Sequence, residues 1–372
     1  MSARIKVVIV INDFLVGGAQ RMMAQLLTRL DRSRFEPVLV TLFDFQGRDT
    51  MYDLVPKDVP VLRLSFSGFS DLRNWLALAR ILRVEQPDVV LSNLFFSNTV
   101  VRLLSIFVRF PVVTVEHNTY IHKTYMQIVC DRLLANITAR IVAVSSHVRD
   151  FTVRQERISE GRFVVIPNGV DTRDLSERAS RADVGVIYKE LGIETSDTLI
   201  ITVGRMTAQK DLPLMVDGFA AYARAHEGVH LVILGDGGLR ADIEAKVRER
   251  GLGNRIKLLG NRADVIPYYA ASAFFLSTSH IEGLSMAHLE ALSCGLPLLS
   301  TRTAGAEELI EEGKNGLFIQ DRTPEAVAKG IEHILSYDRG SLKQAAHETV
   351  SHFDIARAVK SYELLFTAVK GR

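Results

Sequence analysis

The feature of this sequence that most constrains the fold is a series of short apolar runs, separated by amphipathic segments, that occurs twice. In the first half of the chain the runs are Ile5–Ile11, Pro37–Leu42, Asp88–Leu91, Val112–Val115, Arg140–Val144 and Phe163–Ile166. In the second half they are Leu199–Val203, His230–Leu234, Ile256–Leu259, Ala273–Ser277 and Leu296–Ser300. Continuous apolar strands connected by helices are typical of parallel sheets that are covered on both faces. The sequence therefore predicts an α/β protein with two doubly wound, Rossmann-like domains.

The segments between these runs predict helices and domain boundaries. Helical periodicity is clear at Ala19–Leu30, Leu72–Val84 and Ile355–Val369. Residues 171–196 are polar and charged and lack a strand pattern, so we interpret them as a linker. We expect a first domain over residues 1–175, joined by a C-terminal helix within 355–372, and a second domain over 190–354. Ligands of such sheets bind at the carboxyl ends of the strands, which predicts a site in a cleft between two facing domains.

Composition and charge argue against several classes of protein. The chain has 372 residues and a net charge of +2, so nothing in its overall charge suggests a nucleic-acid-binding protein. Residues 1–180 hold 23 Lys and Arg against 18 Asp and Glu, and the remainder holds 22 against 25. This imbalance either favours contact with an anionic surface or arises by chance. Cys130 and Cys294 are far apart in sequence and suggest neither a disulfide framework nor a metal cluster.

Two observations bear on localisation. The first apolar run is short and is not followed by a small-residue cleavage site, so we do not expect a signal peptide. The longest apolar stretch, Val100–Phe110, is interrupted by Arg102, Ser105 and Arg109 and is too short to span a bilayer. We therefore expect a cytoplasmic protein.

The first predicted strand is followed by glycines. Gly17 and Gly18 precede a helix, and such a turn lets backbone N–H groups approach an anion. A tight strand–helix turn without a ligand is the alternative, and the spacing is not the Gly-x-Gly-x-x-Gly of dinucleotide-binding proteins.

The second domain has more evident phosphate chemistry. Arg205 and Lys210 come just after the strand Leu199–Val203 and Gly204. Two cations at a strand end could neutralise a diphosphate without a metal ion, although a pair of solvated surface residues is the alternative. Residues 235–238, Gly-Asp-Gly-Gly, form a sharp turn that either approaches a ligand or only reverses the chain.

Two glutamates, Glu282 and Glu290, flank the predicted start of a helix, eight positions apart. With Glu282 in the preceding loop, both carboxylates would face one ligand, one accepting hydrogen bonds from sugar hydroxyls and the other from a ribose diol. The backbone N–H groups suited to phosphate at this helix start are those of Gly283, Leu284 and Ser285. In the alternative interpretation, Ser279 and Glu282 form a capping box and Glu290 is a surface residue.

Together these motifs resemble those of the retaining GT-B glycosyltransferases of family four, the glycosyl transferases group 1, over nearly the whole chain. The resemblance rests on Gly17-Gly18-Ala19, Glu116-His117-Asn118, the segment from Ile166 through Asn168-Gly169 to Asp171, Gly204-Arg205 with Lys210, and the segment from Glu282 to Glu290. It implies an enzyme that moves a hexose-type sugar from a nucleotide-diphosphate sugar to a glycan or a lipid-linked glycan acceptor. It also implies retention of the anomeric configuration and a role in cell-surface polysaccharide or glycoconjugate synthesis.

The resemblance also implies roles for residues of the second domain, which would bind the nucleotide sugar. Arg205 and Lys210 would bind the donor diphosphate and stabilise the leaving nucleotide. Glu282 would hold hydroxyls of the donor sugar, and Glu290 would hold the ribose.

The first domain would bind the acceptor. Gly17 and Gly18 would line the cleft near the acceptor or the donor phosphate, and His117 would face the transferred sugar. A histidine at a strand end is also commonly a structural residue. The chain departs from the family pattern at Asp211, where a glycine is often found, and at Gln20, where many members have glutamate.

We expect neither a metal ion nor another cofactor. Metal-dependent transferases commonly use an Asp-x-Asp pair, which the sequence lacks. Arg205, Lys210 and a helix N-terminus could supply the positive charge that a departing diphosphate requires.

The acceptor suggests a membrane contact. The stretch Val100–Phe110 is apolar with interspersed arginines, and further arginines follow it in the same domain, namely Arg132, Arg140, Arg149, Arg154, Arg157 and Arg162. A basic, amphipathic face would suit a polyprenyl-linked acceptor at the cytoplasmic face of the membrane, so we advance peripheral attachment as a hypothesis. An ordinary buried helix is the alternative interpretation of this stretch.

Other functions remain as alternatives. The chain could be a non-catalytic subunit that binds a nucleotide sugar for a partner transferase, or a phosphorylase or epimerase of the same fold. A nicotinamide-dependent dehydrogenase is disfavoured because the dinucleotide motif is missing.

Overall fold

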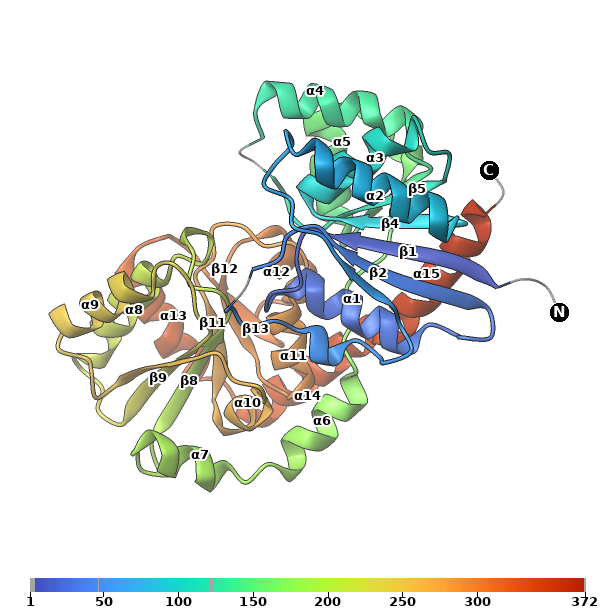
Figure 1. Cartoon of the computed structure of the whole chain (residues 1–372). Coiled ribbons are helices and arrows are strands. Elements are labelled where there is room, and N and C mark those ends of the chain that lie inside the picture. The colour runs from blue at the N-terminus through green and yellow to red at the C-terminus, as the bar shows by residue number, and fades with distance from the viewer. Residues whose placement is uncertain (1–3, 46, 121–122, 371–372) are drawn as a thin grey trace. The chain divides into compact units, whose positions relative to one another are not determined.

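The computed structural model describes residues 4–45, 47–120 and 123–370. The chain divides into two compact units, with residues 1–169 and 355–372 in unit 1 and residues 170–354 in unit 2. Each unit contains one parallel sheet with helices on both faces (Figure 1). The prediction of two doubly wound, Rossmann-like sheets is confirmed.

Unit 1 contains a seven-stranded sheet in the order β3-β2-β1-β4-β5-β6-β7. Its strands are β1 (Ile5–Ile11), β2 (Phe35–Thr41), β3 (Val61–Arg63), β4 (Val89–Asn93), β5 (Val112–Glu116), β6 (Arg140–Ala143) and β7 (Phe163–Val165). Its helices are α1 (Gly18–Arg29), α2 (Leu72–Glu85), α3 (Phe95–Ser105), α4 (Tyr125–Leu134), α5 (Ser146–Glu156) and α15 (Ile355–Val369), with 3-10 turns η1 (Tyr52–Leu54), η2 (Ala135–Ile137) and η3 (Glu160–Arg162).

The strand order determines which helices share a face of the sheet. The chain runs outward from β1 to β3 and then returns to β4, on the other side of β1. Because crossovers between parallel strands are right-handed, this reversal puts α2, α3, α4 and α5 on one face and α1 on the other, where α15 joins it. Figure 1 shows this arrangement.

Unit 2 contains a six-stranded sheet in the order β10-β9-β8-β11-β12-β13. Its strands are β8 (Thr198–Val203), β9 (Val229–Leu234), β10 (Ile256–Gly260), β11 (Phe274–Ser277), β12 (Leu298–Thr301) and β13 (Gly316–Ile319). Its helices are α6 (Thr172–Arg181), α7 (Val184–Leu191), α8 (Leu212–Ala223), α9 (Arg240–Glu249), α10 (Ile266–Ala271), α11 (Met286–Ser293), α12 (Ala304–Leu309), α13 (Pro324–Leu335) and α14 (Arg339–Val350), with 3-10 turns η4 (Ala208–Lys210) and η5 (Ser351–Phe353).

The sequence prediction missed two strands, β3 and β13. Both are short, and each lies at the outer edge of its sheet, with a strand neighbour on one side alone. An edge strand can have a shorter apolar run than a central strand, so it leaves a weaker pattern in the sequence. The terminal helix was predicted with the bounds of α15.

The segment interpreted as a linker, residues 171–196, forms α6 and α7 in unit 2. α6 buries none of its residues and is supported by ion pairs such as Arg173–Glu177 and Arg178–Asp174. A helix that is polar all round carries no apolar periodicity, which explains why the sequence suggested a linker.

No helix in the described part of the chain is long and apolar enough to cross a membrane.

The contact between α8 and α13 requires a glycine, which gives a first prediction. A Cβ at Gly218 would lie 2.3 Å from Cβ of Val327. In Gly218→Ala, the higher helix propensity of alanine adds about 1 kcal/mol to the free energy of unfolding. The added methyl group overpacks the contact between α8 and α13, which lowers the free energy of unfolding by about 1–3 kcal/mol. We expect a lower midpoint of thermal unfolding, measured by circular dichroism. In the control Gly253→Ala the added methyl group meets no atom within 4 Å, so its midpoint should stay near that of the wild type. Equal midpoints for both variants would contradict this packing.

Candidate active site

The carboxyl edge of the unit 2 sheet begins with two interlocked glycine turns. Gly204 follows β8 with φ 158°, and Gly235 follows β9 with φ 122°. A Cβ at Gly235 would lie 2.1 Å from the carbonyl oxygen of Gly204, so the two backbones approach more closely than any side chain would allow. Met206 N–H donates to the Asp236 carbonyl at 2.9 Å, which ties the two loops together. A Cβ at Gly237 would likewise lie 2.5 Å from the Met206 carbonyl oxygen, so the first two glycines of the Gly-Asp-Gly-Gly turn have a structural reason.

The loop after β8 brings two cations to this edge. The Arg205 side chain is exposed and forms no ion pair with any residue that the structure describes. Lys210 extends beside Gly204 and forms an ion pair with Glu282, from the loop after β11. Residues 72 positions apart in sequence are thus joined at one edge of the sheet.

Glu282 is a buried carboxylate. Burial alone raises the pKa of Glu282, but the positive charge of Lys210 and a hydrogen bond from Ser279 Oγ at 2.8 Å outweigh it and lower the pKa below the ordinary value. Glu282 is therefore ionised at neutral pH and accepts hydrogen bonds.

The helix that follows begins later than a capping box would require. α11 starts at Met286, with Ser285 at the N-cap, and Glu282 lies in the loop before it. Ser279 bonds to the Glu282 carboxylate and not to the helix backbone, so the capping-box alternative is wrong. Glu290 is buried and accepts a hydrogen bond from the Tyr269 hydroxyl at 3.3 Å, so the alternative of a surface glutamate is also wrong.

Asp211 has a left-handed backbone (φ 44°), a conformation that glycine adopts most readily. Its carboxylate caps α8 through the Leu214 N–H at 3.4 Å and forms an ion pair with Arg322. Arg322 also donates to the carbonyls of Ser279, at 3.0 Å, and Thr278, at 2.8 Å. These contacts hold the backbone on both sides of the Lys210–Glu282 pair and offset the strain at Asp211.

A third strand end supports the Glu282 loop. Gly305, in α12 after β12, donates its N–H to the Glu282 carbonyl at 3.1 Å. A Cβ at Gly305 would lie 1.6 Å from the carbonyl oxygen of Gly283, so only glycine fits at this position.

His288 lies on α11 between the two glutamates and is buried. Burial lowers the pKa of His288 to about 4, so the ring is neutral near pH 7. Its Nδ1 has no hydrogen-bond partner among the described residues.

In unit 1, polar side chains follow three neighbouring strands. Asn12 follows β1, Asn93 ends β4, and His117 follows β5. His117 Nε2 lies 3.0 Å from Asn93 Oδ1, and Asn12 Oδ1 accepts from the Ser97 N–H at 2.9 Å. Burial lowers the pKa of His117 to about 4. The neutral ring therefore donates from Nε2 to the Asn93 carbonyl oxygen, which leaves Nδ1 as the acceptor.

The glycine turn of unit 1 lies at the same edge. Gly17 is the N-cap of α1, which begins at Gly18. Gln20 Nε2 donates to Asp13 Oδ1 at 3.0 Å, and the Leu15 N–H donates to the same oxygen at 3.1 Å. An amide at position 20 suits Asp13, because a glutamate there would put two carboxylates in contact.

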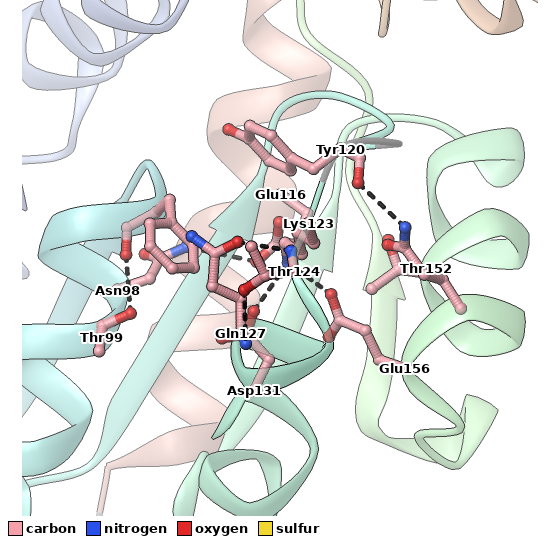
Figure 2. A network of polar contacts seen from close by, with 12 residues as sticks. Asn98, Thr99, Glu116, Tyr120, Lys123, Thr124, Gln127, Asp131, Thr152 and Glu156 are labelled. Carbon is pink, nitrogen blue, oxygen red and sulfur yellow. Dashed lines mark hydrogen bonds and ion pairs between the residues drawn. The ribbon is translucent and has the colours of Figure 1, made fainter. Parts of the chain in front are cut away.

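A buried charge network includes Glu116, the residue that precedes His117 in sequence (Figure 2). Lys123 donates to Asp131 at 2.8 Å and also forms an ion pair with Glu156, and Arg102 forms an ion pair with Asp131. Asn98 Nδ2 donates to Glu116 at 3.3 Å. Burial raises the pKa of Glu116 and Glu156, that of Glu156 to about 7, because two cations only partly offset three carboxylates.

This network corrects one expectation about the surface. Arg102 was expected on a basic face of the stretch Val100–Phe110, but it is 2% exposed and points into the network. Most of this stretch belongs to α3, which is largely buried, as the alternative interpretation stated. Arg109 lies beyond the end of α3 and is exposed.

Sequence reasoning missed several residues of these edges. Arg322 follows β13, a strand that was not predicted, so the signal of a cation at a strand end was lost. Gly305 could have been found as a glycine after a predicted strand. Asn93 lies two residues beyond the predicted strand Asp88–Leu91, at the end of β4, and was not considered. Lys123 carries no local signal, because its partners are distant in sequence.

Two family models match the sequence. The model of the glycosyl transferases group 1 matches residues 185–349, and the model of glycosyltransferase family 4 matches residues 16–174. An Escherichia coli UDP-Gal:alpha-D-GlcNAc-diphosphoundecaprenol alpha-1,3-galactosyltransferase is 26% identical, with 82% of this chain and 81% of the relative covered. A Campylobacter jejuni N-acetylgalactosamine-N,N'-diacetylbacillosaminyl-diphospho-undecaprenol 4-alpha-N-acetylgalactosaminyltransferase is 25% identical, with 94% and 96% covered.

The fold is also found among solved structures. Anabaena Alr3699/HepE in complex with UDP-glucose matches with a TM-score of 0.86 and 20% identity, covering 98% of this chain and 100% of that chain. At this identity the match shows the fold alone.

The neutral state of His288 predicts a pH dependence of stability. An unfolded histidine takes up a proton near pH 6.5, whereas folded His288 takes one up near pH 4. Between these pH values the unfolded chain binds the proton and the folded chain does not, so the free energy of unfolding decreases as the pH falls. We expect His288→Leu, which cannot take up this proton, to gain stability relative to the wild type as the pH falls from 8 to 5. The difference between the two midpoints of thermal unfolding measures this gain. The same difference at both pH values would contradict it.

The buried network predicts a second stability effect. In Lys123→Met, Asp131 and Glu156 lose a buried counter-charge, which costs about 3–5 kcal/mol. We expect a lower midpoint of urea unfolding. Adding Glu156→Gln removes one of the uncompensated carboxylates and should restore part of the loss. A Lys123→Met variant as stable as the wild type would show that the network carries little energy.

Proposed function

Because this chain is a GT-B glycosyltransferase of group 1, we propose that it moves a hexose-type sugar from a nucleoside-diphosphate sugar to a lipid-linked glycan acceptor. The observation that carries the proposal is the pairing of Lys210 with buried, ionised Glu282 beside Gly204 at the carboxyl edge of the unit 2 sheet. Exposed Arg205 stands in the same loop. This edge is where open α/β sheets bind their ligands.

Arg205 and Lys210 bind the donor diphosphate in this proposal. The bond between the anomeric carbon and the phosphate oxygen breaks, and its electron pair goes to the diphosphate, whose growing negative charge the two cations stabilise. The acceptor hydroxyl forms the new bond to the anomeric carbon and gives its proton to the departing phosphate. Attack on the face from which the diphosphate leaves retains the anomeric configuration.

The glutamates orient the donor. Ionised Glu282 accepts hydrogen bonds from hydroxyls of the sugar, and its pairing with Lys210 connects sugar and diphosphate recognition. Glu290 accepts hydrogen bonds from the ribose. The backbone N–H groups of Gly283, Leu284 and Ser285, ahead of α11, add contacts to phosphate oxygens.

Unit 1 contributes the acceptor side. Gly17 and Gly18 allow an approach to the start of α1. The uncharged imidazole of His117, oriented by Asn93, faces the transferred sugar without adding a positive charge near the reacting carbon.

The reaction proceeds without a metal ion or other cofactor in this proposal. Support comes from the two cations of the Arg205–Lys210 loop and from a sequence without an Asp-x-Asp pair. Arginine and lysine can neutralise a diphosphate by themselves.

The acceptor is a glycan carried on a polyprenyl diphosphate. The relatives from Escherichia coli and Campylobacter jejuni are named for diphosphoundecaprenol-linked acceptors, which supports this choice. The product belongs to a cell-surface polysaccharide or glycoconjugate, and the enzyme acts at the cytoplasmic face of the membrane in peripheral contact with it.

The test begins with the donor. We would incubate the protein with a panel of nucleoside-diphosphate sugars and EDTA, without an acceptor, and measure the thermal shift and the slow release of nucleotide. One donor should raise the unfolding midpoint by mass action and release its nucleotide. Lys210→Ala should lower the rate of nucleotide release by about 10²–10³-fold, which is the usual effect of removing one hydrogen-bond donor that stabilises a developing oxyanion.

Lys329→Ala, an exposed lysine on α13 of the same unit, is the matched control and should behave as the wild type. Release of nucleotide that requires an added divalent ion would contradict metal independence. Binding of a donor without its release, with or without a lipid-linked acceptor, would favour the non-catalytic subunit. Release dependent on inorganic phosphate would favour a phosphorylase.

A further inference from the structure

Exposed apolar side chains gather on one face of unit 1. Of the sixteen large hydrophobic side chains that are exposed among the described residues, ten lie between residues 69 and 137. They belong to α2 and the loop before it, to α4 and η2, and to the segment after α3. Figure 1 shows these helices together on one face of the sheet, with α1 and α15 on the other. Single exposed apolar residues need no explanation, but such a concentration marks an interaction surface.

The outer face of α2 combines apolar and basic residues. Leu72, Leu76 and Val84 are exposed, at 74%, 62% and 79%. At 100° per residue they share roughly a third of the helix circumference with Arg73, Arg80 and Arg83. These three arginines are exposed and form no ion pair with a described residue, and no carboxylate lies on this part of the helix. Leucine and arginine on one face, without acidic residues, are typical of helices that lie on an anionic bilayer.

Large apolar side chains are exposed on the outer side of α4. Its inner side carries buried Leu134 and also Asp131, which pairs with Arg102 and with Lys123; Figure 2 shows the Lys123 contact. Its outer side carries the most exposed apolar side chains of the helix, which are Tyr125, Met126 and Leu133 at 81%, 80% and 64%. Three large apolar side chains exposed on one side of a helix are suited to an apolar environment.

A basic pocket lies at the carboxyl end of α4. It is lined by Arg109, Arg140 and Arg162, next to Ile106 and Ile137. Arg140 donates to the Ala139 carbonyl at 2.8 Å and Arg162 to the Thr138 carbonyl at 3.3 Å, but none of the three arginines pairs with a carboxylate in the described chain. Unpaired guanidinium groups beside apolar side chains suit a phosphate group attached to a lipid.

We propose that the outer faces of α2 and α4 and the pocket of Arg109, Arg140 and Arg162 form one surface that docks on an anionic phospholipid bilayer. The leucines and aromatic residues enter the interface, and the pocket takes a lipid phosphate. The inference rests on the proposed function in that it locates the membrane contact which a lipid-linked acceptor requires.

The course of α4 connects this surface to the reacting edge. Tyr125 and Met126 begin the helix just after the loop that follows His117, at the carboxyl edge of the sheet. The pocket residues precede β5, β6 and β7, so the pocket lies at the amino edge of the sheet. Strands of this length put the amino edge roughly 15 Å from the carboxyl edge. The pocket is therefore separate from the reacting edge. A bilayer along α4 would present a lipid-linked acceptor at the end of the helix nearest His117.

The experiment measures co-sedimentation of the full chain with vesicles of phosphatidylcholine, with and without phosphatidylglycerol. Each arginine near an anionic surface contributes roughly a fivefold change in partition, so Arg73→Gln/Arg80→Gln/Arg83→Gln should weaken binding to the anionic vesicles by about 100-fold. Leu76→Gln/Leu133→Gln should weaken it at least about tenfold, because two leucines leave the interface.

Two control variants carry the same kinds of substitution at exposed positions outside the proposed surface. Arg224→Gln/Arg248→Gln/Arg357→Gln changes the net charge equally, and Val186→Gln/Leu364→Gln removes side chains of similar exposure, 58% and 59%. Both should bind vesicles as the wild type does. Slow nucleotide release, measured on every variant, should stay unchanged, so that a loss of membrane binding is distinguished from a failure of the transferase assignment.

Four results would overturn the proposal. These are no binding to anionic vesicles at low salt, equal losses in the surface variants and their controls, binding that ignores phosphatidylglycerol, and a wild-type dimer that Leu76→Gln/Leu133→Gln converts to a monomer. The last would show that the surface binds a second copy of the chain.

The pocket has a test of its own. Arg109→Gln/Arg140→Gln should weaken vesicle binding roughly 25-fold, and free inorganic phosphate should compete poorly with the vesicles. Full competition by free phosphate would show a soluble-anion site instead.

Discussion

All strands of each sheet are parallel, and the arrangement of the candidate site residues depends on this constraint. In a parallel sheet every strand ends at the same edge, so segments that are distant in sequence meet there. Lys210 after β8, Glu282 after β11, Gly305 after β12 and Arg322 after β13 come together in this way. The loops are short and are tied to one another through backbone contacts that only glycine permits at 235 and 305.

The polar groups at these edges are buried in pairs that control their charge. Glu282 keeps its negative charge in a buried position because Lys210 is its neighbour. Burial outweighs the nearby charge of Glu282 at His288 and lowers the pKa of His117 as well, so both rings are uncharged near pH 7. In the proposed function, the edge of unit 2 exchanges the Lys210–Glu282 ion pair for contacts with the donor diphosphate, whereas His117 offers a neutral surface to the sugar.

The buried network of unit 1 links the inside of the domain to its surface. Asp131 and its partners hold the inner side of α4 through charge, together with the buried side chain of Leu134. Three other apolar side chains of the helix, Tyr125, Met126 and Leu133, face outward, where an ordinary surface helix would be polar. The same network explains why Arg102, in a stretch that looks amphipathic, is not part of the surface at all.

The sequence by itself determined the fold class and most strands, because buried parallel strands are continuous apolar runs and their boundaries are marked by polar turns. It also singled out Gly17, Gly204, Arg205, Lys210 and Glu282, because each comes after such a run, and Glu290, because it lies in the helix that follows. Only the tertiary structure decided which residues meet. The pairing of Lys210 with Glu282, the brace of Asp211 by Arg322, and the burial of Arg102 with Asp131 and Lys123 join residues far apart in sequence. Such contacts leave no local pattern, since they arise from sheet order and helix packing.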